Sequence, residues 1–147
     1  MASINFKNYF FDELTYKFNI NFDSENSKEL DVSHSFASTV EIFEKEAFVR
    51  LIVELGDVEN VNCPFSAKVS LVGLFEYTHD SSETKDKLLV KELLSNNSIA
   101  ILYPYIRNIV SDLTLQANQF PAYILPVINV VQMMKDQNSI EVIDHTN

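Results

Sequence analysis

The 147-residue chain has little glycine, a single cysteine and no tryptophan. Its two glycines, Gly56 and Gly73, lie far apart, so the chain lacks the glycine-rich loop that cradles the phosphates of a nucleotide. The lone Cys63 can form neither an intramolecular disulfide nor a thiolate zinc site, and we expect an inert, partly buried side chain. The three histidines have no spacing that puts two ligands on one metal. The sequence therefore predicts no cofactor and no metal.

Positive charge and long hydrophobic runs are also scarce. There are 11 Lys and Arg residues against 21 Asp and Glu, a formal net charge of −10, which argues against binding to nucleic-acid phosphates. The longest apolar runs, such as residues 69–75 with Ser70 inside, are far shorter than the ~18 residues of a membrane span. The first residues lack a basic leader and a cleavage site. We therefore expect a cytoplasmic protein with no membrane insertion.

Apolar residues are plentiful by contrast, at 46% of the chain, with 11 Phe and 6 Tyr. This is enough apolar surface to build a core, so global disorder is excluded. The length fits one domain over residues 1–147. We expect strands within about residues 14–77, a helical half within about 88–135, and a polar tail over 136–147 that frays apart from Ile140 and Val142.

Alternation of apolar and polar residues with period two predicts four strands in the first half. The predicted strands cover residues 14–22, 32–44, 47–55 and about 65–77. Short polar connections at 44–46 and 56–64 favour antiparallel pairing of consecutive strands in a meander. Longer polar loops are expected at 24–31 and 78–86.

From Leu88 the period changes to about 3.6, and an apolar stripe from Ile99 to Ala117 predicts a long helix. Ser98 is its expected cap, and Pro104 predicts either a kink or a start near Tyr103. Two prolines five positions apart then predict an extended apolar crossing segment over residues 120–127. A shorter helix is expected at 130–135. The result is an α+β fold with a four-stranded antiparallel sheet and its helices on one side.

The third and fourth strands carry apolar residues on both faces. In the third strand, Phe48 and Ile52 lie on one face and Leu51 lies on the other. In the fourth strand, Val72 and Leu74 lie on the face opposite that of Leu71 and Phe75. The second face is therefore covered by helices, covered by another subunit, or exposed as a binding patch. A homo-oligomer interface and a ligand surface both remain open at this stage.

Catalytic chemistry has little support in the sequence. The carboxylate pairs at 12–13 and 44/46 fall at polar turns, where solvated charge is expected. No motif joins Cys63 to a histidine; His34 is expected to be satisfied within a strand, and His79 and His145 to be solvated. We predict that the chain is not an enzyme. A small-molecule enzyme on a sheet-plus-helix scaffold is the less favoured alternative.

The segments 101–107, 110–113, 120–121 and 126–127 resemble the C-terminal half of the SecB protein-export chaperone family. In that family a "LFPYAR" helix precedes an "FP" turn and an "APVNF" segment, and the equivalents here are residues 102–107, 120–121 and 125–129. One residue is gained before Phe120, one is lost between Pro121 and Pro126, and Ile128 is inserted before Asn129. Residues 65–75 and 18–24 resemble the last and first strands of the family, so the resemblance covers about 14–135.

This resemblance implies a four-stranded antiparallel sheet with a long helix, assembled as a dimer of dimers. It also implies a chaperone in protein export that uses no nucleotide and holds unfolded or partly folded polypeptides in hydrophobic grooves. Such a groove needs exposed aromatic and aliphatic side chains, because non-native chains share apolar groups and not a sequence. The candidate client-binding residues are Phe120, Tyr123, Ile124, Leu125 and Val127, with Tyr103, Ile106 and Val110 beneath them as groove floor or plain core.

The docking surface for the translocase motor is where the chain departs from the family. The resemblance assigns this acidic surface to positions that read Asn19, Asp23 and Lys68 here. An amide and a lysine in place of carboxylates weaken the attraction for a basic partner. Motor docking is therefore not expected to be retained. The alternative to a general holdase, a chaperone that binds clients without folding them, is a module dedicated to one partner such as an antitoxin.

Overall fold

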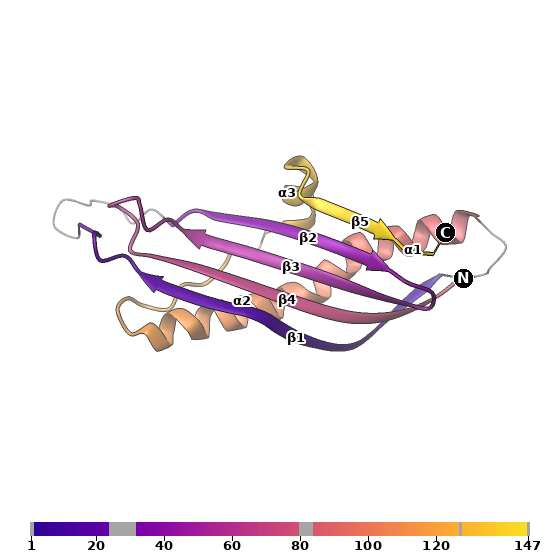
Figure 1. Cartoon of the computed structure of the whole chain (residues 1–147), viewed down its shortest axis with the longest axis horizontal. Coiled ribbons are helices and arrows are strands. Elements are labelled where there is room, and N and C mark those ends of the chain that lie inside the picture. The colour runs from indigo at the N-terminus through magenta and orange to yellow at the C-terminus, as the bar shows by residue number, and fades with distance from the viewer. Residues whose placement is uncertain (1, 24–31, 80–83, 127, 147) are drawn as a thin grey trace.

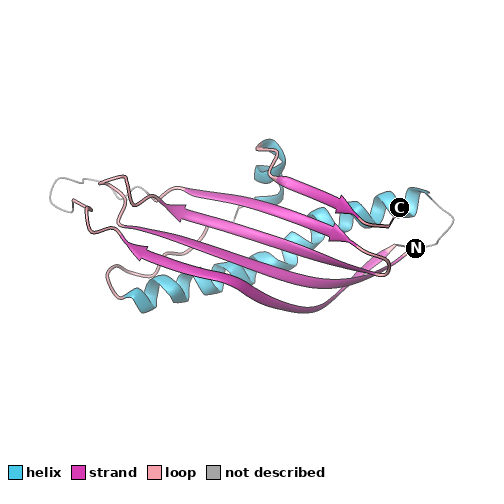
Figure 2. Cartoon of the chain, in the orientation of Figure 1, coloured by secondary structure: helices cyan, strands magenta, loops and turns pink. Residues whose placement is uncertain are grey.

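The structure is a computed structural model that describes residues 2–23, 32–79, 84–126 and 128–146. It consists mainly of long strands with alternating apolar and polar residues and of one long amphipathic helix. A five-stranded sheet forms one layer and the helices lie on one of its faces (Figures 1 and 2). The elements are β1 (Ser3–Phe18), β2 (His34–Ile42), β3 (Glu46–Gly56), β4 (Phe65–Thr78), α1 (Thr84–Glu92), the π-helical turn η1 (Leu93–Asn97), α2 (Ser98–Ala117), α3 (Val130–Asp136) and β5 (Ile140–Asp144). The α+β class is confirmed.

The strand order is β1-β4-β3-β2-β5, so the predicted meander holds only for β2, β3 and β4. β1 pairs antiparallel with β4 instead of β2, because the connection after β1 is long enough to cross the sheet. β1 also begins eleven residues before the predicted start at Leu14 and ends at Phe18. Register shifts between Phe6 and Asn8 and between Phe11 and Glu13 break its alternation, and this hid its first half in the sequence.

β5 lies in the polar tail, for which we predicted no strand and fraying except at Ile140 and Val142. It pairs in parallel with β2, from Ser38 opposite Ile140 to Ile42 opposite Asp144. The strand was not predicted because five residues, with Ile143 interrupting the alternation of Ile140 and Val142, give a weak strand signal. The predicted four-stranded sheet therefore has a fifth strand.

The core lies between α2 and one face of the sheet. In β3 the inward residues Ala47, Val49, Leu51 and Val53 have no exposed surface, as the alternation predicts. The predicted stripe on α2 is buried at Ile99, Leu102, Ile106 and Val110. Gly73 allows α2 to approach β4 closely, since a Cβ there would lie 2.8 Å from a methyl carbon of Leu102.

The helical half begins before the predicted start. α1, η1 and α2 follow one another without a break from residue 84, so Ser98 lies inside helical backbone and is not a cap. Its hydroxyl donates to the carbonyl oxygen of Leu94. Pro104 lies within α2, which therefore does not start near Tyr103. Asp86, predicted in an exposed loop, is buried in α1, while residues 80–83 of that loop and the loop 24–31 fall outside the described residues.

Two predictions about polar side chains are wrong. The Nδ1 atom of His34 is buried with no hydrogen-bond partner among the described residues, and its ring packs edge-on against Phe36. His79 is half-buried with its Nδ1 atom buried and stacks on Tyr77, so it is not a solvated side chain, whereas His145 stacks on Phe43 and is exposed, as predicted. Cys63 is more deeply buried than expected, with 1% of its surface exposed and a 3.1 Å hydrogen bond from Sγ to the carbonyl oxygen of Phe65.

Candidate functional site

The crossing segment, residues 120–126, runs extended along α2 and is held there by three helix side chains. The Tyr103 hydroxyl donates to the carbonyl oxygen of Pro126 at 2.7 Å, and Arg107 Nε donates to that of Leu125 at 3.1 Å. The Thr114 hydroxyl accepts the backbone N–H of Tyr123 at 2.8 Å. The crossing segment therefore runs antiparallel to α2.

These anchors share one side of the helix because they are four and seven residues apart. Tyr103 and Thr114 are buried, with 9% and 4% of their surface exposed. Burial raises the pKa of the Tyr103 hydroxyl even though the charge of Arg107 lowers it, so the phenol stays protonated and remains a donor. Backbone polar groups that the extended segment cannot pair in a sheet are satisfied in this way.

The crossing segment alternates between the core and solvent. Leu125 has no exposed surface, Tyr123 is half-buried and Ile124 is 66% exposed. Burial also raises the pKa of the Tyr123 hydroxyl. The predicted client-binding residues therefore divide: Leu125, Tyr103, Ile106 and Val110 are buried, Phe120 and Tyr123 are half-buried, Ile124 is exposed, and Val127 falls outside the described residues.

Two series of aromatic contacts connect the crossing segment to β1, β4 and the residues that follow β1. Phe120 stacks on Phe18 with ring centroids 6.3 Å apart and meets Phe22 edge-on at 5.6 Å. Tyr123 meets Phe65 edge-on at 6.1 Å, and Phe65 stacks on Tyr16 at 5.3 Å. Phe18 and Phe22 both fall within the predicted strand 14–22, and their contacts with Phe120 were not predicted. The available signal was the high phenylalanine content of residues 6–22.

Further apolar side chains are exposed where β1 and α2 end, at the same end of the molecule (Figure 1). Phe18 is 43% exposed, Ile20 85% and Leu115 56%. We call this set the aromatic surface: Phe18, Ile20, Phe22, Leu115, Phe120, Tyr123 and Ile124. Its side chains are uncharged and exposed or half-buried, which suits binding to apolar groups of another chain.

The three positions assigned to a translocase-facing surface do not form one. Asn19 is 1% exposed: its amide donates to the carbonyl oxygens of Cys63 at 2.8 Å and Asn60 at 3.0 Å. It follows the end of β1 and joins two loops, so its prediction as a surface residue is wrong. Asp23 is half-buried, and its backbone N–H donates to Val61. Of the three, Lys68 alone lies on a strand, on the face opposite α2.

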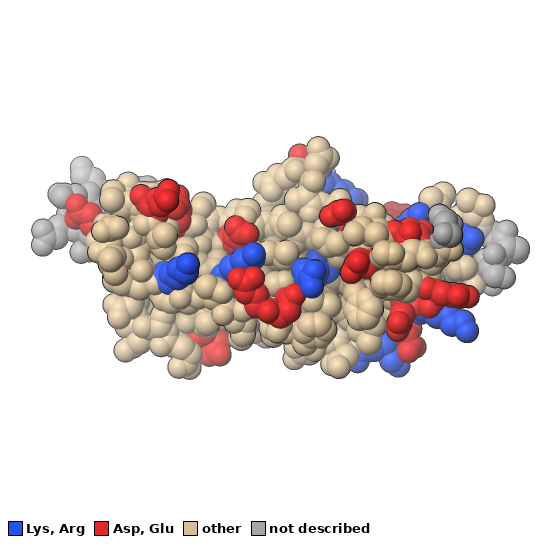
Figure 3. Space-filling view, viewed as in Figure 1, with Lys and Arg blue, Asp and Glu red and all other residues tan. Residues whose placement is uncertain are grey.

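That open face of the sheet carries both signs of charge, interspersed along its middle (Figure 3). Arg50 pairs with Asp12 at 2.9 Å and Lys68 with Glu13 at 3.5 Å. Burial raises the pKa of Asp12, but hydrogen bonds from Ser70 and Arg50 and the charge of Arg50 outweigh it, so the net direction is down. The acids on this part of the face are therefore partly neutralised within the chain.

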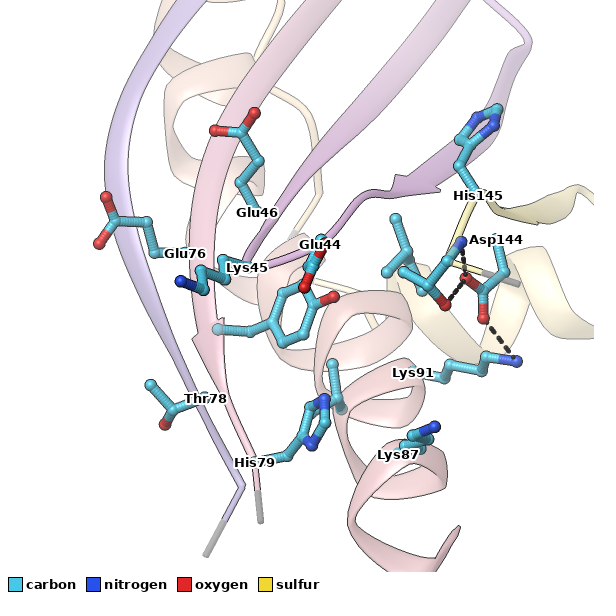
Figure 4. A pocket seen from close by; sticks show the side chains of 14 residues that line it. Glu44, Lys45, Glu46, Glu76, Thr78, His79, Lys87, Lys91, Asp144 and His145 are labelled. Carbon is cyan, nitrogen blue, oxygen red and sulfur yellow. Dashed lines mark hydrogen bonds and ion pairs between the residues drawn. The ribbon is translucent and has the colours of Figure 1, made fainter. Parts of the chain in front are cut away.

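A cleft of about 920 Å³ lies where α1 faces the β2–β3 turn and the end of β5 (Figure 4). Lysines and carboxylates alternate around it, and Lys91 pairs with Asp144 at 3.1 Å. Over the described ranges, no three histidine, cysteine, aspartate or glutamate side chains gather to hold a metal. The cleft thus has no single charge sign to select an ionic ligand.

The protein belongs to the α+β class, and its long helix and crossing segment cover one face of the sheet. Its backbone matches that of "Mycobacterium tuberculosis Rv1957 SecB-like chaperone in complex with a ChAD peptide from Rv1956 HigA1 antitoxin" with a TM-score of 0.66. That match has 19% identity and covers 85% of this chain and 90% of the other, so it shows the fold.

The model of the family "Preprotein translocase subunit SecB" matches residues 12–141. The chain belongs to the SecB family. It is also 32% identical over 120 residues to "Uncharacterized protein MJ0357" of Methanocaldococcus jannaschii, a match covering 80% of this chain and 66% of that protein. Membership of this family supports a chaperone role and makes the chain a non-enzymatic protein. No helix in the described ranges is both long and apolar enough to span a membrane.

Proposed function

We propose that this protein is a cytoplasmic, nucleotide-independent holdase that binds apolar segments of non-native polypeptides on the aromatic surface. The observation that carries the proposal is Ile124, 66% exposed between the inward side chains of Tyr123 and Leu125. The anchors on α2 keep the segment extended, so its outward side chain is presented without loss of the core beneath. Uncharged aromatic neighbours accept many sequences because apolar contact is non-directional.

We further propose a homo-oligomer formed along β1. The strand pairs with β4 on one side and has no strand partner on the other side within the described ranges. Tyr9, Phe10 and Leu14 on this strand are 39%, 54% and 46% exposed. A long, apolar edge of this kind is normally covered, and a second copy covers it by antiparallel pairing. A dimer of dimers is the assembly that we expect.

The second candidate function is that of a chaperone module dedicated to one partner. It is favoured by the structural neighbour whose bound peptide comes from an antitoxin. The neutralised acids of the open sheet face, Asp12 and Glu13, favour it over motor docking in protein export, because a basic partner gains little from paired carboxylates. Such a module binds its partner saturably and leaves unrelated proteins unprotected.

Light scattering tests the general holdase. A chemically denatured, unrelated protein is diluted into buffer that contains the chain and no nucleotide. We expect suppression of scattering at near-stoichiometric amounts, and roughly tenfold weaker suppression by Ile124→Asp because an exposed aliphatic contact is lost. The matched control is Leu88→Asp, a change at a side chain that is 63% exposed on α1.

The outcomes separate the candidates. Equal loss in both variants shows that added charge alone, and not the aromatic surface, weakens suppression. No suppression by the natural chain overturns the general holdase and leaves the dedicated module. Sedimentation of the natural chain at several concentrations tests the oligomer, and a monomer at all concentrations overturns pairing along β1.

A further inference from the structure

β5 differs from every other strand of the sheet. It has five residues and pairs in parallel with β2, whereas the pairs among β1, β2, β3 and β4 are antiparallel. It covers only residues 38–42 of β2, so the outer side of the first half of β2 has no strand partner in the described ranges. β5 is thus an addition to one edge of a complete antiparallel sheet (Figure 1).

Backbone pairing is the main attachment of β5. Beyond the strand pairs, Ser38 N–H donates to Ser139 at 2.8 Å and His145 N–H donates to Ile42 at 2.8 Å. None of the five residues of β5 is buried, and Val142 is 41% exposed. Ile140 is half-buried and packs against the hydrophobic core. On the helix side, β5 therefore contributes one half-buried aliphatic side chain and no fully buried one to the core.

Surface contacts complete the attachment. Asp144 pairs with Lys91 of α1 at 3.1 Å, beside the cleft shown in Figure 4. His145 lies 3.5 Å from a carboxylate oxygen of Glu41 and stacks on Phe43 with centroids 4.5 Å apart. Partly exposed ion pairs contribute little to stability. An edge strand held by such contacts opens at far lower free energy than the strands inside the sheet.

The edge that opening would expose has the chemistry of a polypeptide-binding site. Residues 38–42 of β2 present a row of N–H and C=O groups that accepts any extended chain, and this recognition does not depend on sequence. β5 is itself such an extended segment: its register places Ile140 and Val142 on the helix face of the sheet, and Glu141 and Ile143 on the open face.

We propose that the outer edge of β2 is a second polypeptide-binding site and that β5 is its built-in competitor. An extended segment of a non-native polypeptide displaces β5 and pairs with residues 38–42 of β2. This inference rests on the proposed holdase function and adds to it a site separate from the aromatic surface. Clients that bind weakly leave β5 in place, so the strand sets a threshold for binding at this edge.

A disulfide that locks β5 onto β2 tests the proposal. Thr39 and Glu141 are register partners, and Cα atoms of adjacent strands fall within the range that a disulfide spans. In the double variant Thr39→Cys/Glu141→Cys, we expect the oxidised form to need at least about threefold more chain than the reduced form for half-maximal suppression of scattering. Amide exchange of residues 140–144 should quicken when client is added to the reduced form, and not in the oxidised form.

The matched control links two strands that do not separate. Ser35 of β2 and Glu54 of β3 are register partners, and Ser35→Cys/Glu54→Cys forms its disulfide on the same open face. Oxidation of this variant should leave suppression unchanged. Cys63 is buried at 1% exposure and stays outside both disulfides.

Three outcomes are distinguishable. A loss on locking β5 together with no loss in the control supports the proposal. Equal suppression by the oxidised and reduced forms of the β5 variant overturns it and leaves the holdase standing. No suppression by the natural chain overturns the holdase and this inference together.

Discussion

The crossing segment and β5 are both extended, yet they are held in opposite ways. Side chains of α2 form hydrogen bonds with the backbone of the crossing segment at three points, and Leu125 of that segment is fully buried. β5 has no fully buried residue and is held by backbone pairing with β2, by the half-buried Ile140 and by surface contacts. The first segment depends on specific side chains, and the second depends on groups that every polypeptide has.

This difference assigns the two segments different parts in binding. A segment fixed by its own side chains can present Ile124 to solvent and stay in place when a client binds. A strand fixed by its backbone can be replaced by another backbone. We therefore expect the crossing segment to act as a fixed platform and β5 as an exchangeable cover. The predictions below test this contrast, beginning with the largest expected effect.

Matched polar substitutions in the two segments should give the largest difference in the free energy of unfolding. Leu125→Asn puts an amide into a fully buried site and should lower the free energy of unfolding by about 3 kcal/mol. Val142→Asn in β5 changes a residue that is 41% exposed and should cost less than about 0.5 kcal/mol. Urea denaturation of both variants measures the difference. Equal losses would show that β5 is as firmly integrated as the crossing segment.

Asn19 should matter nearly as much, because it fixes the loop that carries Phe22 to Phe120. Its side chain donates to two backbone carbonyls and accepts the N–H of Asn21 at 3.0 Å. Asn19→Ala leaves these buried groups unpaired and should cost about 2 kcal/mol. Asn21→Ala, at an exposed position two residues later, is the control and should cost less than about 0.5 kcal/mol. If the two variants unfold alike, the loop is not held by the Asn19 amide.

Much of the fold could be predicted from the sequence because its periodicities are strong. The strand ranges of β2, β3 and β4, the stripe on α2 and the start of α3 were all predicted to within a few residues. The first half of β1 was missed because two register shifts break its alternation. Strand order was missed because short connections suggested a meander and the long connection after β1 was not weighed.

The site was harder to predict, because a hydrophobic residue in an extended segment points inward or outward according to tertiary contacts. Tyr103, Thr114 and Arg107 fix that choice through hydrogen bonds between residues up to 23 positions apart, and no local pattern encodes them. Ile124 and Leu125 are adjacent and similar in chemistry, and their exposures are 66% and zero. Asn19 shows the same limit, since an amide in an alternating run gave no sign of its buried loop contacts.

Loss of a single anchor should loosen the crossing segment without unfolding the chain. Thr114→Val keeps the shape of a buried side chain and removes the acceptor of the Tyr123 N–H, at a cost of about 1 kcal/mol. Amide exchange at Tyr123 should quicken, while amides of β5 should not change. Thr15→Val is the control, because the Thr15 hydroxyl bonds only to a surface carboxylate of Glu13 in the described structure. Unchanged exchange at Tyr123 would show that Thr114 is not an anchor.

The smallest effect is expected from acid below pH 3.8, where protonation of Asp144 should loosen β5. Hydrogen bonds from Thr146 and Lys91, with the charge of Lys91, hold the pKa of Asp144 below its ordinary value of 3.8 against a smaller opposing effect of burial. Because the folded pKa is the lower one, this stabilisation is present above pH 3.8 and is lost as the pH falls through the folded value. Amide exchange of residues 140–144, corrected for its intrinsic pH dependence, should therefore show more opening in that range. Asp144→Asn should show the greater opening at every pH, and the amide of Tyr123 should be unaffected because its anchors include no carboxylate. The same acid response in Asp144→Asn as in the natural chain would assign the effect to another group.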